Sequence, residues 1–204
     1  MNETKMARFV GSIPETYDRE LGPFLFEYYA EDLAARLKAP AGGRVLEIAC
    51  GTGISTEYAR NVLDAGISIT ATDLNPPMLE HAEANRSHLA GVTFSQADAQ
   101  ALPFGDGQFD ALFCQFGVMF LPDKPLGFSE FFRVLKPGGT LALNVWDSLE
   151  RNPVVGLAFE TICSFFESDP PLFLSIPFGW NDHAVIRAHL EDAGFGDGAI
   201  EAAP

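Results

Sequence analysis

The chain has 204 residues, of which 47% are hydrophobic and 20% are charged. This length and composition fit a globular domain with a well-buried core and exclude a disordered chain. The formal net charge is −15, and a surface this acidic repels phosphate backbones, so we expect no nucleic-acid partner.

The sequence also lacks the patterns expected of an exported protein, a membrane protein or a metal site. Its N-terminus lacks the apolar core of a signal peptide, and no apolar run reaches membrane-spanning length. The three cysteines lie far apart without metal-binding spacing. We therefore expect a cytoplasmic protein with no membrane partner, no metal site and no disulfide framework.

Short apolar runs alternate with helical patterns through most of the chain. A helix is expected over 17–38. Five buried strands are then expected at 45–49, 68–72, 92–97, 109–116 and 140–146, with helices between them at 55–63, 76–89 and 125–135. This alternation is typical of an α/β fold, a mostly parallel, twisted sheet with helices on both faces.

The rhythm breaks at residues 147–181, which are rich in Phe and Pro. A helix is expected over 153–166, followed by irregular chain. Asn181 or Asp182 then caps a helix that runs to Ala193. The remaining residues have room for one partial strand.

The turn Cys50-Gly51-Thr52-Gly53 joins the first strand to a helix N-terminus. Small residues there let a ligand approach the backbone, and the helix end offers free N–H groups. A dinucleotide fingerprint would have a third glycine where Thr56 stands, and a phosphate loop would have a nearby lysine. Glu47, inside the first strand, suits a ligand with positive charge better than a pyrophosphate.

Two further acids follow other strands. Asp73 ends the second strand, where an acid can accept from both hydroxyls of a ribose. Asp98 follows the third strand and could accept from an exocyclic amine, which suggests adenine. A nucleoside with a positive charge and no pyrophosphate indicates S-adenosylmethionine.

Four segments carry this pattern in order: VLEIACGTG, ITATDLNPPML, ADAQALPFGDGQFDALFCQFG and RVLKPGGTLAL. In them the chain resembles class I S-adenosylmethionine-dependent methyltransferases of the small-molecule group (methyltransferase type 11), which includes the ubiquinone- and menaquinone-biosynthesis type. The resemblance is close over about residues 40–147. It implies a Rossmann-like methyltransferase fold, whose C-terminal hairpin would be shortened or missing here, with S-adenosyl-L-methionine as cofactor and S-adenosyl-L-homocysteine as product.

The resemblance also implies the residues that hold the cofactor. The glycine turn would cradle methionine and ribose, although Ala49 stands where the family usually has glycine. Gln115 and Phe116 would face the methionine and the substrate, and Tyr17 would cover the cofactor. The full set of cofactor-binding residues implied is Tyr17, Glu47, Ala49, Gly51, Gly53, Asp73, Leu74, Asp98, Ala99, Gln115 and Phe116.

We therefore expect one methyltransferase domain over residues 1–204. It would comprise an N-terminal helical cap (1–39), a cofactor-binding core (40–147), a substrate-lid insertion (148–181) and a terminal helix with a partial strand (182–204). The expected activity is methyl transfer to a small-molecule acceptor by in-line displacement, in a monomer or homodimer. Gln115 and His183 are the catalytic candidates, no strong general base stands out, and the acceptor stays open.

Two alternatives to this function remain. A methyltransferase-like module could bind S-adenosylmethionine and transfer nothing. Ala49 and the short C-terminal part are the features that favour this alternative. A nicotinamide-dependent oxidoreductase is the other, against which Thr56 and Glu47 argue. Some site residues also have ordinary structural interpretations: Asp98 as a turn residue, Gln115 as a structural amide, Tyr17 as an amphipathic anchor, and His81 as a solvent-facing helix residue.

Overall fold

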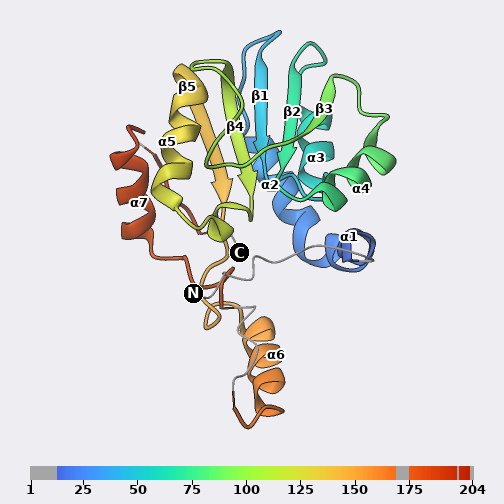
Figure 1. The fold of residues 1–204 in the computed structure, drawn as a ribbon, viewed down its shortest axis with the longest axis vertical. Helices are drawn as coiled ribbons and strands as arrows, with labels where there is room; N and C mark the ends of the chain where they lie inside the picture. The colour runs from blue at the N-terminus through green and yellow to red at the C-terminus, as the bar shows by residue number, and fades with distance from the viewer. Residues whose placement is uncertain (1–12, 169–174, 197, 203–204) are drawn as a thin grey trace.

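The computed structural model describes residues 13–168, 175–196 and 198–202. At its centre lies a parallel five-stranded sheet in the order β3-β2-β1-β4-β5 (Figure 1). The strands are β1 (Arg44–Ile48), β2 (Ser68–Asp73), β3 (Val92–Gln96), β4 (Phe109–Gln115) and β5 (Leu135–Asn144). The predicted α/β class and parallel sheet are confirmed.

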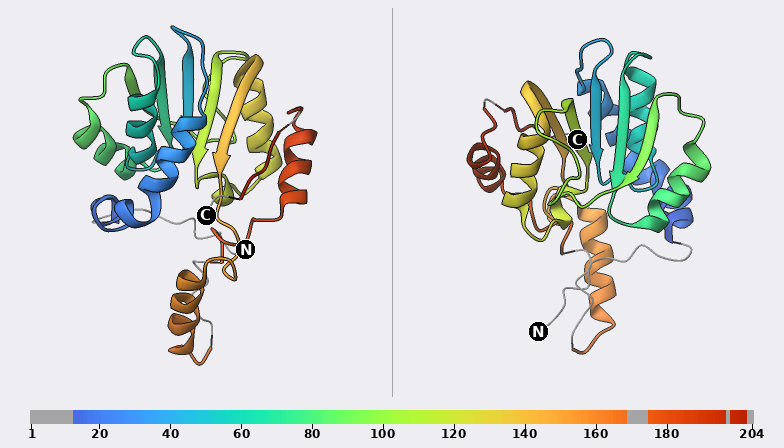
Figure 2. Two further views of the ribbon diagram at one scale, coloured as in Figure 1. Left: turned by 180° about the vertical axis from the view of Figure 1, so that it is seen from behind. Right: turned by 45° about the horizontal axis from the view of Figure 1, so that its top comes forward.

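Helices cover both faces of this sheet (Figure 2). The helices of the described residues are α1 (Ile13–Thr16), the π-helix η1 (Tyr17–Phe26), α2 (Glu27–Arg36), α3 (Ile54–Val62), α4 (Pro76–Arg86), the 3₁₀ helix η2 (Val118–Phe120), α5 (Lys124–Val134), α6 (Pro153–Ser164) and α7 (His183–Asp192). Successive strand residues point to opposite faces. Leu46 packs with Phe128 and Phe131 of α5, whereas Val45 packs with α2 and α3. Burial on both faces is strongest in the central strands β1 and β4, which are also the most apolar.

The strand order reverses between β1 and β4. The chain passes from β1 to β2 and β3 on one side, then crosses back to β4, which pairs with β1 on its other side. In open parallel sheets, ligands bind beyond the carboxyl ends of the strands at such a reversal. In Figure 1 the arrowheads of the strands point toward the side where α1 and η2 lie.

The N-terminal helical region is not the single helix that was predicted. It consists of α1, the ten-residue π-helix η1 and α2. Pro23 lies inside η1 and has no N–H to donate, so it cannot continue an α-helical ladder. Gly22 is buried there against Ile54, whose Cδ1 would lie 3.0 Å from an added Cβ. Helical spacing of apolar residues alone does not reveal such a change of winding, and π-helical turns are frequent at functional sites.

The start of β5 also differs from the prediction. The segment Lys136–Gly139 was expected only to end a helix, but β5 already begins at Leu135, which pairs with Phe109. The register of the pairing shifts between Phe109 and Ala111. Because this pairing is irregular, the sequence shows no pattern there from which a strand could be predicted. The strand ends at Asn144, two residues before the predicted end at Trp146.

The partial strand expected after α7 is absent from the described residues there, 193–196 and 198–202. Two arginine side chains hold this tail instead, one through its backbone and one through a side chain. Arg187 Nη1 donates to the Gly198 carbonyl at 3.1 Å, and Arg36 pairs with Glu201 at 2.8 Å. Gly196 and Gly198 in this tail weaken any strand.

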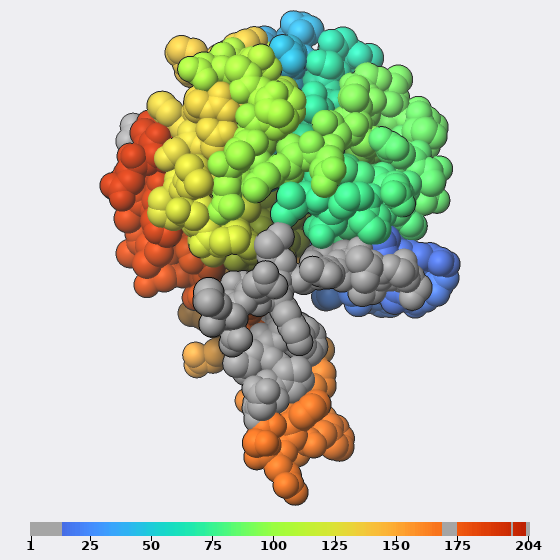
Figure 3. All heavy atoms as spheres, in the orientation of Figure 1, coloured from blue at the N-terminus to red at the C-terminus, as the bar shows by residue number. Residues whose placement is uncertain are grey.

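Helix α6 projects away from the rest of the protein (Figures 1 and 3). It has no buried residue, and Val154 is 81% exposed. The predicted helix is present, although it ends at Ser164 rather than 166. Among the described residues, no helix has the length and apolarity needed to cross a membrane.

Candidate active site

The turn after β1 places open backbone at the strand reversal. Gly51 and Gly53 have φ angles of +56° and +88°, the left-handed region that favours glycine. A Cβ on Gly51 would meet nothing within 4 Å, whereas one on Gly53 would lie 2.8 Å from Arg86 Cδ. Gly51 therefore leaves room for a ligand, and Gly53 leaves room for the arginine.

Two non-glycine residues share this left-handed conformation, and both follow the central strands directly. Ala49 follows β1 with φ +54°, and Phe116 follows β4 with φ +50°. Each such residue costs about 1–2 kcal/mol, and strain of this kind gathers at functional sites. The two turns interlock, because a Cβ on Gly117 would lie 2.5 Å from Ala49 Cβ.

Glu47 lies fully buried beneath the glycine turn. Its carboxylate accepts hydrogen bonds from Ser55 Oγ at 2.5 Å and Thr56 Oγ1 at 2.6 Å. Burial raises the pKa of Glu47 to about 7, while the two hydroxyls work in the opposite direction. Glu47 thus ties β1 to the first turn of α3. The sequence analysis noted Thr56 only as a missing glycine, although hydroxyl residues at the start of a helix after an in-strand acid could have signalled this clamp.

Asp73 supports the same turn from β2. Its Oδ2 accepts from the Gly51 N–H at 2.8 Å, and its Oδ1 accepts from the Asn75 N–H at 2.8 Å and the Asn75 amide at 3.1 Å. A carboxylate offers about four acceptor positions, so capacity for a ligand hydroxyl remains. The next residue, Leu74, is 38% exposed beside it.

Asp98 and Ala99 lie just beyond the end of β3. Asp98 Oδ1 accepts from the Gln100 N–H at 2.9 Å, so Asp98 does act as a turn residue. The loop starts next to Asp73, because the Ala97 N–H donates to the Asp73 carbonyl at 3.1 Å. Ala99 is buried.

A cavity of about 30 Å³ separates the glycine turn from η1. It is lined by Tyr17, Phe26, Ala49, Cys50, Gly51, Thr52, Ile54, Ser55 and Gln115. The Tyr17 and Phe26 rings stack at 4.5 Å, and burial, with Asp73 adding, raises the pKa of Tyr17. About 30 Å³ is the share of one water molecule, whereas small-molecule sites span about 300–1,000 Å³. η1 therefore leaves little space above the glycine turn.

Gln115 joins β4 to this cover. Its Nε2 donates to the Phe26 carbonyl at 3.1 Å. Its Oε1 is buried and has no hydrogen-bond partner among the described residues. A buried acceptor without a partner is unusual and marks a position where a ligand donor would fit.

Aromatic rings pack against one another in the cluster that begins at Phe116, directly after Gln115. Phe116 stacks on Trp146 with centroids 4.0 Å apart, Trp146 stacks on Phe178 at 5.5 Å, and Tyr29 meets the Phe116 ring edge-on at 5.3 Å. We refer to Phe116, Trp146, Phe178 and Tyr29 as the aromatic wall. Phe178 comes from the far end of the segment that carries α6, a contact that the sequence did not reveal.

The structure does not bring His183 to the glycine turn. It is the exposed first residue of α7, which packs on α5, on the opposite side of the protein from α1 in Figure 1. The interpretation of His81 as solvent-facing is wrong. Its Nε2 lies 3.4 Å from Asp18 Oδ2, and the side chain is 17% exposed.

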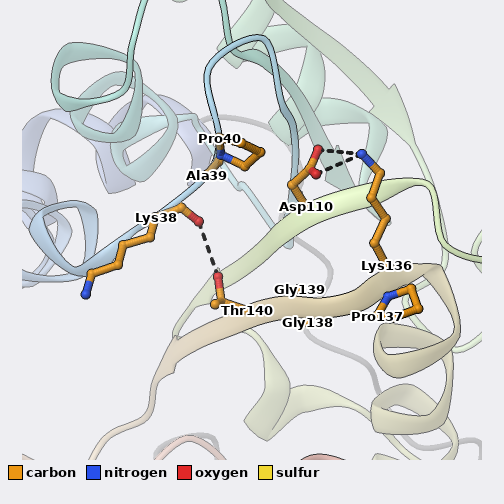
Figure 4. Close-up of a pocket in the computed structure, with 9 residues that line it drawn as sticks. All are labelled: Lys38, Ala39, Pro40, Asp110, Lys136, Pro137, Gly138, Gly139 and Thr140. Carbon is orange, nitrogen blue, oxygen red and sulfur yellow. Dashed lines mark hydrogen bonds and ion pairs between the residues drawn. The ribbon is translucent and has the colours of Figure 1, made fainter.

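A larger cavity, of about 360 Å³, lies at the opposite edge of the sheet (Figure 4). Two of its charged side chains are paired with each other: Lys136 Nζ contacts both Asp110 carboxylate oxygens at 2.8 Å, and the Arg44 N–H donates to Asp110. The hydrogen bonds from Lys136 and Arg44 hold the pKa of Asp110 below its usual value. This cavity lies at the amino ends of β1, β4 and β5, away from the strand reversal, so we assign the site to the smaller one.

Comparisons with known proteins agree with this geometry. A family model described as "Methyltransferase domain" matches residues 46–143. A demethylmenaquinone methyltransferase of Renibacterium salmoninarum is 40% identical over 170 residues, covering 78% of this chain and 69% of that protein. An uncharacterized protein of Mycobacterium tuberculosis is 41% identical over 108 residues, covering 52% of this chain and only 38% of that protein.

The fold agrees as well. The crystal structure of an S-adenosylmethionine-dependent methyltransferase from Aquifex aeolicus matches with a TM-score of 0.66 at 22% identity, covering 90% of this chain and 87% of that one. The chain therefore belongs to the class I S-adenosylmethionine-dependent methyltransferases, a family whose cofactor is S-adenosylmethionine.

Proposed function

We propose that this protein transfers the methyl group of S-adenosylmethionine to a small-molecule acceptor with a planar, apolar ring. The observation that carries the proposal is the aromatic wall, which begins at Phe116, directly after Gln115 at the carboxyl end of β4. Flat aromatic surfaces favour offset stacking with planar ligands. The net charge of −15 argues against a nucleic acid as the acceptor.

The described residues fit the cofactor once η1 moves. Gly51 offers open backbone, and Asp73 keeps acceptor capacity for one ribose hydroxyl. Asp98 and the Ala99 N–H would contact adenine, and the exposed side chain of Leu74 would pack on its face. Glu47 and Ala49 would not cover the cofactor but would hold the glycine turn beneath it in place. Tyr17 would cover the bound cofactor.

The cofactor supplies a methyl group on a sulfonium, which is already a good leaving group. The residues of this chain therefore mainly align the acceptor and exclude water. Alignment of this kind can contribute roughly 7–11 kcal/mol of barrier reduction. Gln115 Oε1, buried without a partner, would accept a hydrogen bond from the cofactor or the acceptor at the junction of the two.

The acceptor to test first comes from a relative. The Renibacterium salmoninarum protein is named for demethylmenaquinone, a ring compound that suits the aromatic wall. The monomeric or homodimeric state, and the division into a cap (1–39), a core (40–147), a lid insertion (148–181) and a terminal part (182–204), remain predictions.

The first experiment is calorimetric titration with S-adenosylmethionine and with S-adenosylhomocysteine, using the wild type and Asp73→Ala. Asp110→Ala is the matched control, because Asp110 lies at the opposite edge of the sheet. We expect micromolar binding that Asp73→Ala weakens at least tenfold, or about 1.4 kcal/mol, and that Asp110→Ala leaves within twofold. A folded wild type that binds neither compound would refute the cofactor assignment.

Transfer is then measured with methyl-labelled cofactor and a reduced demethylmenaquinone analogue, followed by other planar acceptors. Label in the acceptor supports the proposal. Ala49, which stands where the family usually has glycine and has a left-handed backbone, favours one second candidate, a module that binds the cofactor and transfers nothing. Cofactor binding without transfer to any planar acceptor would support that candidate instead.

A further inference from the structure

One carboxylate of η1 reaches across to two other elements. Asp18 Oδ1 accepts from Thr52 Oγ1 at 2.9 Å and from Arg86 Nη2 at 3.1 Å. Its Oδ2 lies 3.4 Å from His81 Nε2. Partial burial opposes its charge, yet Arg86 and these hydrogen bonds hold the pKa of Asp18 below its usual value. Asp18 is therefore an ionised anchor between η1 and the glycine turn.

The partner of this anchor is fixed in place. Arg86, at the end of α4, is only 9% exposed. Its Nη1 donates to the Thr52 carbonyl at 2.7 Å, and its Nε pairs with Glu57 at 3.2 Å. The absence of a side chain at Gly53 gives the arginine its space. Because these contacts do not involve η1, they hold Arg86 in place even when η1 moves.

The size of the cavity shows which side must move. The space of about 30 Å³ between the glycine turn and η1 is too small for the methionine part of S-adenosylmethionine. The turn beneath is braced by Asp73 from β2 and by Glu47 from β1. The cover consists of Tyr17 and Phe26, both in the π-helical segment. Entry of the cofactor therefore requires η1 to lift, which breaks the contacts of Asp18.

We propose that Asp18 is a positioning residue that holds η1 closed over the cofactor turn, and that its contacts with Arg86 and Thr52 set the rate at which cofactor enters and leaves. The inference rests on the cofactor site proposed above. Opening exchanges two charge-assisted hydrogen bonds for water at a side chain that is 23% exposed, a change large enough to control a rate. The ionisable groups facing Asp18 are Arg86 and His81 of α4, with Glu57 behind Arg86.

The test compares Asp18→Ala with Glu15→Ala. Glu15 belongs to the adjoining helix α1, and its ion pair with Arg19 is exposed and stays within the N-terminal segment, so it is the matched control. Hydrogen exchange is measured without cofactor on a peptide spanning 17–26. Stopped-flow fluorescence then gives the association and dissociation rate constants for S-adenosylmethionine.

We expect Asp18→Ala to raise amide exchange in 17–26 about tenfold without changing exchange in β1. The association rate constant should rise at least fivefold, and dissociation should rise more. A merely structural role would not speed association. Unchanged exchange in 17–26, or association no faster than in the wild type, would overturn the inference.

A second variant guards against misfolding. Thr52→Val removes one of the contacts of Asp18 and leaves the ion pair with Arg86, so a smaller rise of the same sign is expected, and its absence would count against the inference. If the wild type binds no cofactor, the proposed function fails, while exchange in 17–26 still decides whether Asp18 holds η1 closed.

Discussion

Replacing Glu47 by glutamine should change how the stability of the protein depends on pH. Glu47 is fully buried, and its pKa of about 7 compares with an ordinary 4.5. Between these values the native state retains a proton that the unfolded state has lost. The free energy of unfolding of the wild type therefore falls as pH rises from 4.5 to 7, and this contribution is constant above that.

The size of the effect follows from the two pKa values. Between pH 5 and pH 8 the wild type should lose about 2.5 kcal/mol through this one group. Glutamine stays neutral, and its amide can still bond with Ser55 and Thr56 as the protonated acid does. The difference in the free energy of unfolding between Glu47→Gln and the wild type should therefore shift by about 2.5 kcal/mol in favour of the variant between pH 5 and pH 8.

Urea unfolding at the two pH values measures this gap. Glu80→Gln is the control, because Glu80 is exposed on α4, and its gap should not move by more than about 0.5 kcal/mol. Parallel pH curves for the wild type and Glu47→Gln would refute the reasoning. They would mean that the hydroxyls of Ser55 and Thr56 keep Glu47 ionised throughout.

Three further outcomes are expected. Gly117→Ala should lower the free energy of unfolding in urea by about 1–3 kcal/mol through overpacking, because its Cβ would lie 2.5 Å from Ala49 Cβ. Adding Ala49→Gly should recover part of that loss. If the effects of the two substitutions simply added, that result would speak against the contact. Trp146→Leu should raise the acceptor KM at least fivefold while cofactor affinity by calorimetry stays within twofold; an equal loss of both would place Trp146 outside the acceptor site. Asp182→Ala should cost about 1 kcal/mol, since Asp182 caps α7 through the Ala184 N–H; no change in urea midpoint would show that the cap is dispensable.

The parts of the fold that depend on local pattern were predictable. Apolar runs in β1 and β4 and β-branched residues in β2 and β3 give these strands to within about a residue. Gly51 and Gly53 fall at the predicted turn for the same local reason, since left-handed backbone favours glycine.

The parts that depend on distant partners were not predictable. The winding of η1 follows from Pro23 and from packing on Ile54, and the start of β5 follows from an irregular pairing with β4. Asp18 and Arg86 are 68 positions apart, so the Tyr17-Asp18 pair suggested a role only for the tyrosine. The role of Ser55 and Thr56 in binding Glu47 could be seen only from the geometry of the turn.

The strand order also bears on how the protein folds. Val45 pairs with Ile69, 24 positions along the chain, and with Ala111, 66 positions along. Closing the longer loop costs about 0.9 kcal/mol more in chain entropy, which corresponds to a factor of about four to five in rate if nothing else intervenes. The half with β1, β2 and β3 can therefore form first, and docking of β4 is expected to limit folding. Because the cofactor turn and Gln115 meet only at that docking, the site is completed in the slowest step.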